Sequence, residues 1–174
     1  MDTRRHAIDP TLLTTAPAEV TAQAGMDTLT HCVEAYVSLA HGRLTDSLAL
    51  QSLAGVWTNL ARLVDDPTDR DAGEEMAMAS LRAGMAFTNA ILGAAHAMSH
   101  PVGGRCDAPH GTINSVLLPH VIRYNALVCA DDFVSLADAV GLDTSGDPRT
   151  VAEAIRRERD PGTVRRPAGA RVDC

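Results

Sequence analysis

The spacing of apolar side chains constrains the fold of this chain more than any other feature of its sequence. Between residues 21 and 38, apolar side chains recur at steps of three and four residues, and similar spacing runs through residues 45–64 and 71–87. This period is that of an amphipathic α-helix, which turns one apolar stripe towards a core. Shorter runs that predict helices cover residues 111–125, 131–140 and 150–159. The sequence therefore predicts an all-α fold, a helical bundle.

Residues with strong local preferences predict where these helices begin and end. Thr68 and Asp71 have the spacing of a capping box and predict the start of the third helix. Asp131 is expected to cap a later helix, and Gly141 is expected to close it. Pro119 is expected to interrupt the helix at 111–125, because proline lacks a backbone N–H and clashes with the preceding turn.

Charge and composition exclude two classes of partner. The net charge is −7, and acidic residues outnumber arginines throughout residues 1–147, which disfavours a nucleic-acid backbone as a partner. No run of eighteen apolar residues occurs, so the sequence predicts no membrane span. The N-terminus shows no secretory signal, and the scattered cysteines form no C-x-x-C pair. We therefore expect a cytoplasmic protein without a thiolate zinc site.

Three histidines gather in the stretch from Ala94 to Gly111, AAHAMSHPVGGRCDAPHG. A step of four residues puts His96 and His100 on one face of a helix. Pro101 is expected to end that helix, so that the chain turns and returns before His110. The three imidazoles would then converge on one point. The alternative is that each histidine is separately a core or surface residue.

A polar stripe on the helix at 21–38 lies nearly opposite its apolar stripe and consists of Asp27, His31, Glu34 and Ser38. Taken alone, such a stripe favours a solvent-exposed face. An aspartate and a histidine four residues apart can also bind one metal ion. A carboxylate together with imidazoles suits a divalent transition metal such as Fe²⁺ or Zn²⁺. Asp27, His31 and the three later histidines exceed the need of one site, and spacing alone leaves open whether His96 or His100 binds.

Several longer motifs occur in one order: GMDTLTHCVEAY at 25–36, AGMAFTN at 83–89, HAMSHPVGG at 96–104, PHG at 109–111 and LLPHVIRYN at 117–125. Together they closely resemble the metal-binding helical half of the iron-containing, group III alcohol dehydrogenases. The resemblance runs from about Asp9 to Gly141.

The resemblance implies a role for each matching position. The metal ligands of the family fall on Asp27, His31, His96 and His110. His100 matches a catalytic and cofactor-binding histidine near the nicotinamide and the substrate, and Phe87 matches an aromatic position of the substrate pocket. The expected cofactors are Fe²⁺ or Zn²⁺, with NAD or NADP in the full-length proteins. The expected reaction interconverts alcohols and aldehydes or ketones, with the ion polarising the alcohol oxygen while hydride passes to NAD(P)⁺.

The resemblance also divides the chain. We expect an N-terminal linker at 1–16, a helical metal-binding domain at 17–142, and an Arg-, Pro- and Gly-rich tail at 143–174 that is largely disordered. After about Thr150 the sequence is not expected to match the family. The family's N-terminal nucleotide-binding domain, with its Gly-Gly-Gly-Ser stretch, has no counterpart in this sequence, so we expect a fragment. Its expected partners are a small alcohol or aldehyde and either a separate nucleotide-binding domain or further copies of itself.

Two other functions remain open. A non-catalytic metal-binding remnant, or an interaction domain of the same fold, would keep the helices without the enzymatic activity. A helical metal-dependent hydrolase would share aspartate and histidine ligands, although it would lack the ordered motifs of the family.

Overall fold

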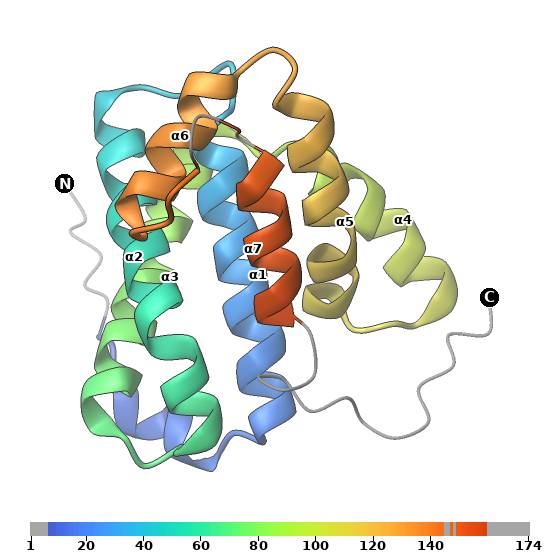
Figure 1. Cartoon of the computed structure of the whole chain (residues 1–174). Helices are drawn as coiled ribbons and strands as arrows, with labels where there is room; N and C mark the ends of the chain where they lie inside the picture. The colour runs from blue at the N-terminus through green and yellow to red at the C-terminus, as the bar shows by residue number, and fades with distance from the viewer. Residues whose placement is uncertain (1–6, 145–146, 148, 160–174) are drawn as a thin grey trace, which may run out of the picture.

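The computed structural model describes residues 7–144, 147 and 149–159, and within this part every regular element is a helix. Figure 1 shows these helices as one bundle. The elements are η1 (Pro10–Thr15), α1 (Ala18–Tyr36), α2 (Arg43–Asp65), α3 (Arg70–Ala90), α4 (Ala94–Cys106), α5 (His110–Asn125), α6 (Ala130–Ala139) and α7 (Arg149–Arg159). The prediction of an all-α bundle is confirmed.

Helix α1 lies at the centre of the bundle, between the α2–α3 pair and the α4–α5 pair (Figure 1). It packs against α2, α3 and α5, and its Met26, Leu29 and Val33 belong to the main core. These are residues of the apolar stripe that predicted the helix, which begins at Ala18 rather than Thr21. Since its apolar face is turned towards the core, its polar stripe is left to meet α3, α4 and α5.

Both prolines that were expected to interrupt helices lie inside them. Helix α4 continues through Pro101 to Cys106, and Asp107, in the left-handed region with φ 50°, follows its end. The φ of proline is compatible with a helix, so the cost of Pro101 is the missing N–H bond to Ala97 and the crowding of its ring against that carbonyl. Ala97 and Pro101 are exposed, and water can satisfy that carbonyl. Helix α5 likewise includes Pro119. The turn before His110 therefore follows Cys106, not His100.

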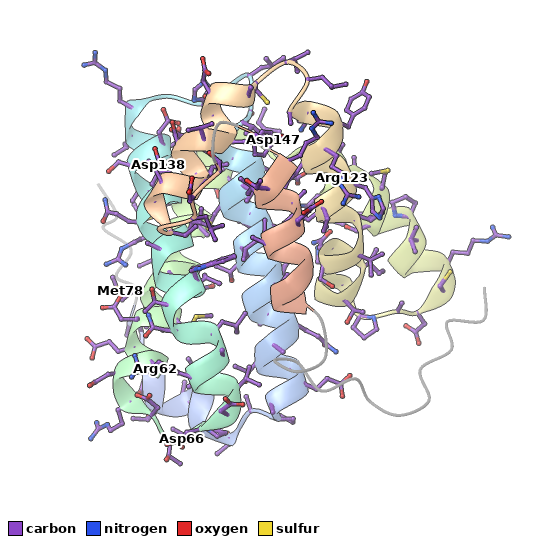
Figure 2. All side chains as sticks on the ribbon, viewed as in Figure 1. Arg62, Asp66, Met78, Arg123, Asp138 and Asp147 are labelled. Carbon is purple, nitrogen blue, oxygen red and sulfur yellow. The ribbon has the colours of Figure 1, made fainter. Side chains whose placement is uncertain are left out.

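The capping residues differ from two of the predictions. Asp69, not Thr68, caps α3, because its carboxylate accepts the backbone N–H of Ala72 at 3.0 Å. Thr68 instead belongs to the preceding turn, where its N–H donates to Asp66 at 2.9 Å. In Figure 2, Asp66 lies at the end of the bundle where α2 leads into α3. Asp131 lies in the first turn of α6 rather than at its cap.

The two outer boundaries of the domain are also wider than predicted. Residues 10–15 are not a linker loop but the helix η1, which packs against α3. Helix α7 packs against α5 and α6, and its Val151, Ala152 and Ile155 are buried in the core. The domain boundary at 142 is therefore placed too early. Residues 160–174, where the largely disordered tail was predicted, lie outside the described residues, as do residues 1–6 of the predicted linker.

Gly141 confirms the predicted end of α6. It directly follows the C-cap residue Val140 and has a φ of 71°, which glycine adopts without the steric cost of a Cβ atom. In the part of the chain that the structure describes, no helix has the length and apolarity needed to cross a membrane.

Candidate metal centre

Three potential metal ligands from three different helices converge on one point. Asp27 comes from α1, His96 from α4 and His110 from the first turn of α5, and one ligand atom of each lies within 4.8 Å of the others. Asp27 Oδ1 is 3.4 Å from His96 Nε2 and 3.4 Å from His110 Nε2. A separation of this size is the edge of a tetrahedron whose centre is about 2.1 Å from each corner, an ordinary bond length for a divalent ion. The two distances that join Asp27 to the histidines therefore match the spacing of metal ligands, and the third pair lies within 4.8 Å.

His31 lies beside this group on the other oxygen of the same carboxylate. Its Nε2 is 3.8 Å from Asp27 Oδ2. Its ring stacks between Phe87, with ring centroids 4.4 Å apart, and His96, with centroids 4.6 Å apart. His31 thus does not belong to the convergent group. It faces the second oxygen of Asp27, whose first oxygen faces His96 and His110. Its assignment as a fourth ligand stays a prediction.

The polar stripe of α1 is not a solvent-exposed face. Glu34 is 2% exposed, and the hydroxyl of Ser38 donates to the backbone carbonyl of Ala90 at the end of α3. The side chain of His31 is only 18% exposed. The stripe therefore packs against neighbouring helices, and the alternative that it faces water is wrong.

Glu34 is a site residue that the sequence did not identify as one. Its Oε2 lies 2.6 Å from Nδ1 of His96, while Nε2 of the same ring faces Asp27. Burial lowers the pKa of His96, but its hydrogen bonds with Asp27 and Glu34 prevail and raise it to about 9. Burial alone would raise the pKa of Glu34, yet bonds from His96 and from the backbone of Ala95 and Gly93 lower it. The only sequence signal was the place of Glu34 on the same stripe as Asp27.

Asn114 is the second residue that the sequence missed. It lies on α5 one turn after His110, and its Nδ2 is 2.7 Å from Asp27 Oδ1, 3.1 Å from His96 Nε2 and 3.0 Å from His110 Nε2. One amide nitrogen has two hydrogens to donate and here faces three polar atoms, of which the carboxylate oxygen accepts in any state and each ring nitrogen accepts only when it carries no hydrogen. Its Oδ1 is buried and has no hydrogen-bond partner among the described residues.

This arrangement around Asn114 tests whether the site fits a cation. The two ends of a carboxamide have nearly the same size, so a half-turn about χ2 would bring Oδ1 to the place of Nδ2. A carboxylate oxygen, two imidazole nitrogens and an amide oxygen would then face one point, and this donor set suits a divalent transition metal. The residues that are present therefore fit such an ion.

His100 lies at the rim of the centre. Its ring stacks on His110 with centroids 5.1 Å apart and meets His96 edge-on at 5.9 Å. The residue is exposed, whereas His96 is 2% exposed. The two histidines that sequence spacing left equivalent thus have different surroundings, and only His96 belongs to the convergent group.

An all-helical domain that directs a carboxylate and imidazoles from three helices to one point has the structure of a metal-binding domain. Comparison with known proteins gives its family. The profile described as Fe-containing alcohol dehydrogenase family, C-terminal, matches residues 21–160. This chain belongs to that family. The match continues past residue 141 and includes α7, so the expectation that the family resemblance ends before this helix is wrong.

Individual relatives agree with this assignment. The chain is 48% identical over 138 residues to the 1,3-propanediol dehydrogenase of Citrobacter freundii, covering 79% of this chain and 36% of the relative. It is 38% identical over 135 residues to the NADPH-dependent butanol dehydrogenase of Clostridium saccharobutylicum, covering 78% of this chain and 34% of the relative. The chain thus spans about a third of the length of these relatives.

A solved structure has the same fold. The crystal structure of a 1,3-propanediol oxidoreductase superposes with a TM-score of 0.83 at 45% sequence identity, covering 89% of this chain and 42% of that one. The predicted identity of the bundle, as the helical part of an iron-containing alcohol dehydrogenase, is confirmed at the level of the family.

Proposed function

We propose that this chain is the metal-binding part of an NAD(P)-linked oxidoreductase that interconverts alcohols and aldehydes or ketones. The observation that carries the proposal is the convergence of Asp27, His96 and His110 in a chain of this family. A divalent ion held there, Fe²⁺ or Zn²⁺, supplies a Lewis acid that polarises the substrate oxygen. His31 is proposed as the fourth ligand, because it faces the second oxygen of Asp27.

His100 is proposed to act on the substrate and the nicotinamide rather than on the ion. Its ring is exposed and stacks on His110, so an imidazole that can donate or accept a proton lies at the rim of the centre. Phe87 is proposed to line the substrate pocket, because it stacks on His31 and is only half-buried.

The nicotinamide cofactor is proposed to be bound mainly outside the described residues. These residues form helices only, and the sequence has no G-x-G-x-x-G motif. One relative is named an NADPH-dependent butanol dehydrogenase, which supports a nicotinamide cofactor for the whole enzyme. We propose that a separate nucleotide-binding domain supplies the remaining contacts to the nicotinamide, and that copies of the chain assemble with one another.

The test is a fusion in which this chain replaces the matching C-terminal part of the Citrobacter freundii 1,3-propanediol dehydrogenase. The metal-loaded fusion is expected to reduce NAD(P)⁺ in the presence of 1,3-propanediol or butanol. Asp27→Asn should abolish this turnover, because it removes the carboxylate charge on which the centre converges. Glu74→Gln, at an exposed position on α3, should leave it unchanged. A fusion that binds the ion and the nicotinamide but turns over no alcohol would favour a non-catalytic remnant.

A further inference from the structure

We propose that Glu34 is a positioning residue of this centre, which fixes the ring of His96 in its metal-binding form and ties it to the start of α4. The inference rests on the proposed function, because it assigns His96 to the ion. It adds Glu34, which is not one of the proposed ligands, and assigns to it the orientation of the His96 ring.

The hydrogen-bond partners of the His96 ring determine its form. A carboxylate only accepts hydrogen bonds, so the contact of 2.6 Å between Glu34 Oε2 and His96 Nδ1 requires the hydrogen on Nδ1. In the neutral ring, Nε2 then keeps its lone pair, and this atom faces Asp27 Oδ1 at 3.4 Å. Histidines that bind metals commonly donate their other ring nitrogen to a carboxylate in this way. Both side chains are almost fully buried, which excludes water as a competing partner.

The same carboxylate also completes the N-terminus of α4. The N-cap residue Gly93 offers no side-chain hydrogen bond, so the first N–H groups of the helix need other partners. Glu34 Oε1 accepts the backbone N–H of Ala95 at 2.6 Å, and Oε2 lies 3.4 Å from the N–H of His96. A negative charge at a helix N-terminus is further stabilised by the helix dipole.

Gly93 allows this close approach. A Cβ atom on Gly93 would lie 2.8 Å from Glu34 Oε1, closer than such atoms ordinarily come. One carboxylate from α1 therefore fixes both the first turn of α4 and the ring that this turn carries. The position of His96 is set before any ion arrives.

Glu34→Gln tests this role directly. Glutamine has the shape of glutamate, but its NH₂ group donates hydrogen bonds, whereas a carboxylate only accepts them. If its carbonyl accepts from Ala95, its NH₂ group faces Nδ1 of His96, and the ring hydrogen must move to Nε2. The first measurement is the ¹⁵N spectrum of the His96 ring in metal-free protein at alkaline pH, where the ring is neutral. The parent protein should carry the hydrogen on Nδ1 and the variant on Nε2. A hydrogen on Nε2 in the parent overturns the inference, and this measurement does not depend on metal binding.

The second measurement is the affinity for Zn²⁺, by competition with a chelator. Glu34→Gln should bind about 10- to 100-fold more weakly than the parent. Glu34→Asp keeps the polarity of both bonds and should recover part of the affinity. Glu74→Gln is the matched control and should bind as the parent does. If folded Glu34→Gln binds Zn²⁺ as tightly as the parent, then Glu34 only supports the helix, and the inference is wrong.

Gly93→Ala covers the case in which Glu34→Gln does not fold. This change displaces the Glu34 carboxylate without altering its charge, so Zn²⁺ affinity should again fall. Parental affinity in a folded Gly93→Ala variant overturns the inference. Failure of the proposed function has a different signature: the parent protein binds no Zn²⁺, while the ¹⁵N spectrum still reports the Glu34 bond.

Discussion

The amide nitrogen of Asn114 lies 2.7 Å from Oδ1 of Asp27, at the point that Nε2 of His96 and of His110 also face. In the metal-free chain this side chain therefore bridges α5 and α1 through the centre itself. Its buried Oδ1 has no hydrogen-bond partner among the described residues. A bound ion would have to turn the carboxamide, which would present that oxygen, or displace it.

Asn114→Asp should consequently have opposite effects on the two states of the protein. Without metal, two carboxylates would face each other and the free energy of unfolding should fall by about 1–3 kcal/mol, because a donor is replaced by an acceptor. With Zn²⁺ the new carboxylate is a favourable ligand, so the metal-induced rise in Tm should exceed that of the parent. Thermal unfolding with and without Zn²⁺ measures both effects. Asn89→Asp, at an exposed position on α3, is the control. Unchanged unfolding of Asn114→Asp in both states would show that Asn114 is peripheral to the site.

His96 and His100 should differ in their effect on metal content. His96→Ala should lose most of the bound ion, because its Nε2 belongs to the convergent group and its ring is buried. His100→Ala should keep a metal content close to that of the parent, as should the exposed control His120→Ala. Inductively coupled plasma mass spectrometry of the three variants provides the comparison. Equal loss in His96→Ala and His100→Ala would refute the separate roles of the two residues.

His31→Ala should weaken Zn²⁺ binding by at least about 10-fold, because the proposed fourth ligand would be removed. Phe87→Leu removes the stacking partner of His31 but no ligand atom, so it should mainly lower stability, by about 0.5–1.5 kcal/mol. Chelator competition and urea unfolding separate these effects. If His31→Ala binds as tightly as the parent, His31 is not a ligand of the ion.

Cys32 should resist alkylation in the folded protein. Its burial raises the pKa of the thiol to about 12, against the opposing hydrogen bond with Ser52. Since the thiolate is the reactive form and the folded pKa lies far above 8, almost no thiolate exists at pH 8. Burial and the charge of Asp132 also raise the pKa of Cys129, but this residue is partly exposed and should react with iodoacetamide before Cys32. Peptide mass spectrometry after timed labelling measures the difference, which should vanish in denaturant. Equally fast labelling of both residues in the native protein would contradict the burial of Cys32.

The parts of the structure that local patterns determine were predictable. The apolar steps of residues 21–38 predicted α1 within three residues at its start, and Gly141 predicted the end of α6. Predictions of helix ends were less reliable where they depended on a single residue. Pro101 was expected to end α4, but a single missing N–H at an exposed position does not break that helix.

The interior of the centre was only partly predictable, because its contacts join different helices. Asp27, His31, His96 and His110 were predicted as ligands from the family resemblance, and three of them, Asp27, His96 and His110, lie together. Glu34 and Asn114 were not predicted, since Glu34 meets His96 on α4, 62 residues away, and Asn114 meets Asp27 on α1, 87 residues away, although Asn114 also lies one turn after His110. Helix α7 was predicted as a short helix, but its Val151, Ala152 and Ile155 were assigned to the tail, because the surrounding composition is polar. These three residues have the spacing of one helix face, which indicates that the face is buried, but the local sequence does not show that it packs against α5.

Metal stoichiometry shows whether Asp27, His96 and His110 form one site for a divalent ion. The protein is equilibrated with Zn²⁺ at neutral pH, dialysed, and assayed for zinc per chain. Asp138→Ala, at an exposed position on α6 labelled in Figure 2, serves as the control. We expect about one ion per chain in the parent and the control, and none above background in the double variant Asp27→Ala, His110→Ala. A parent without zinc, or a double variant that retains it, would show that these three residues do not form the metal site.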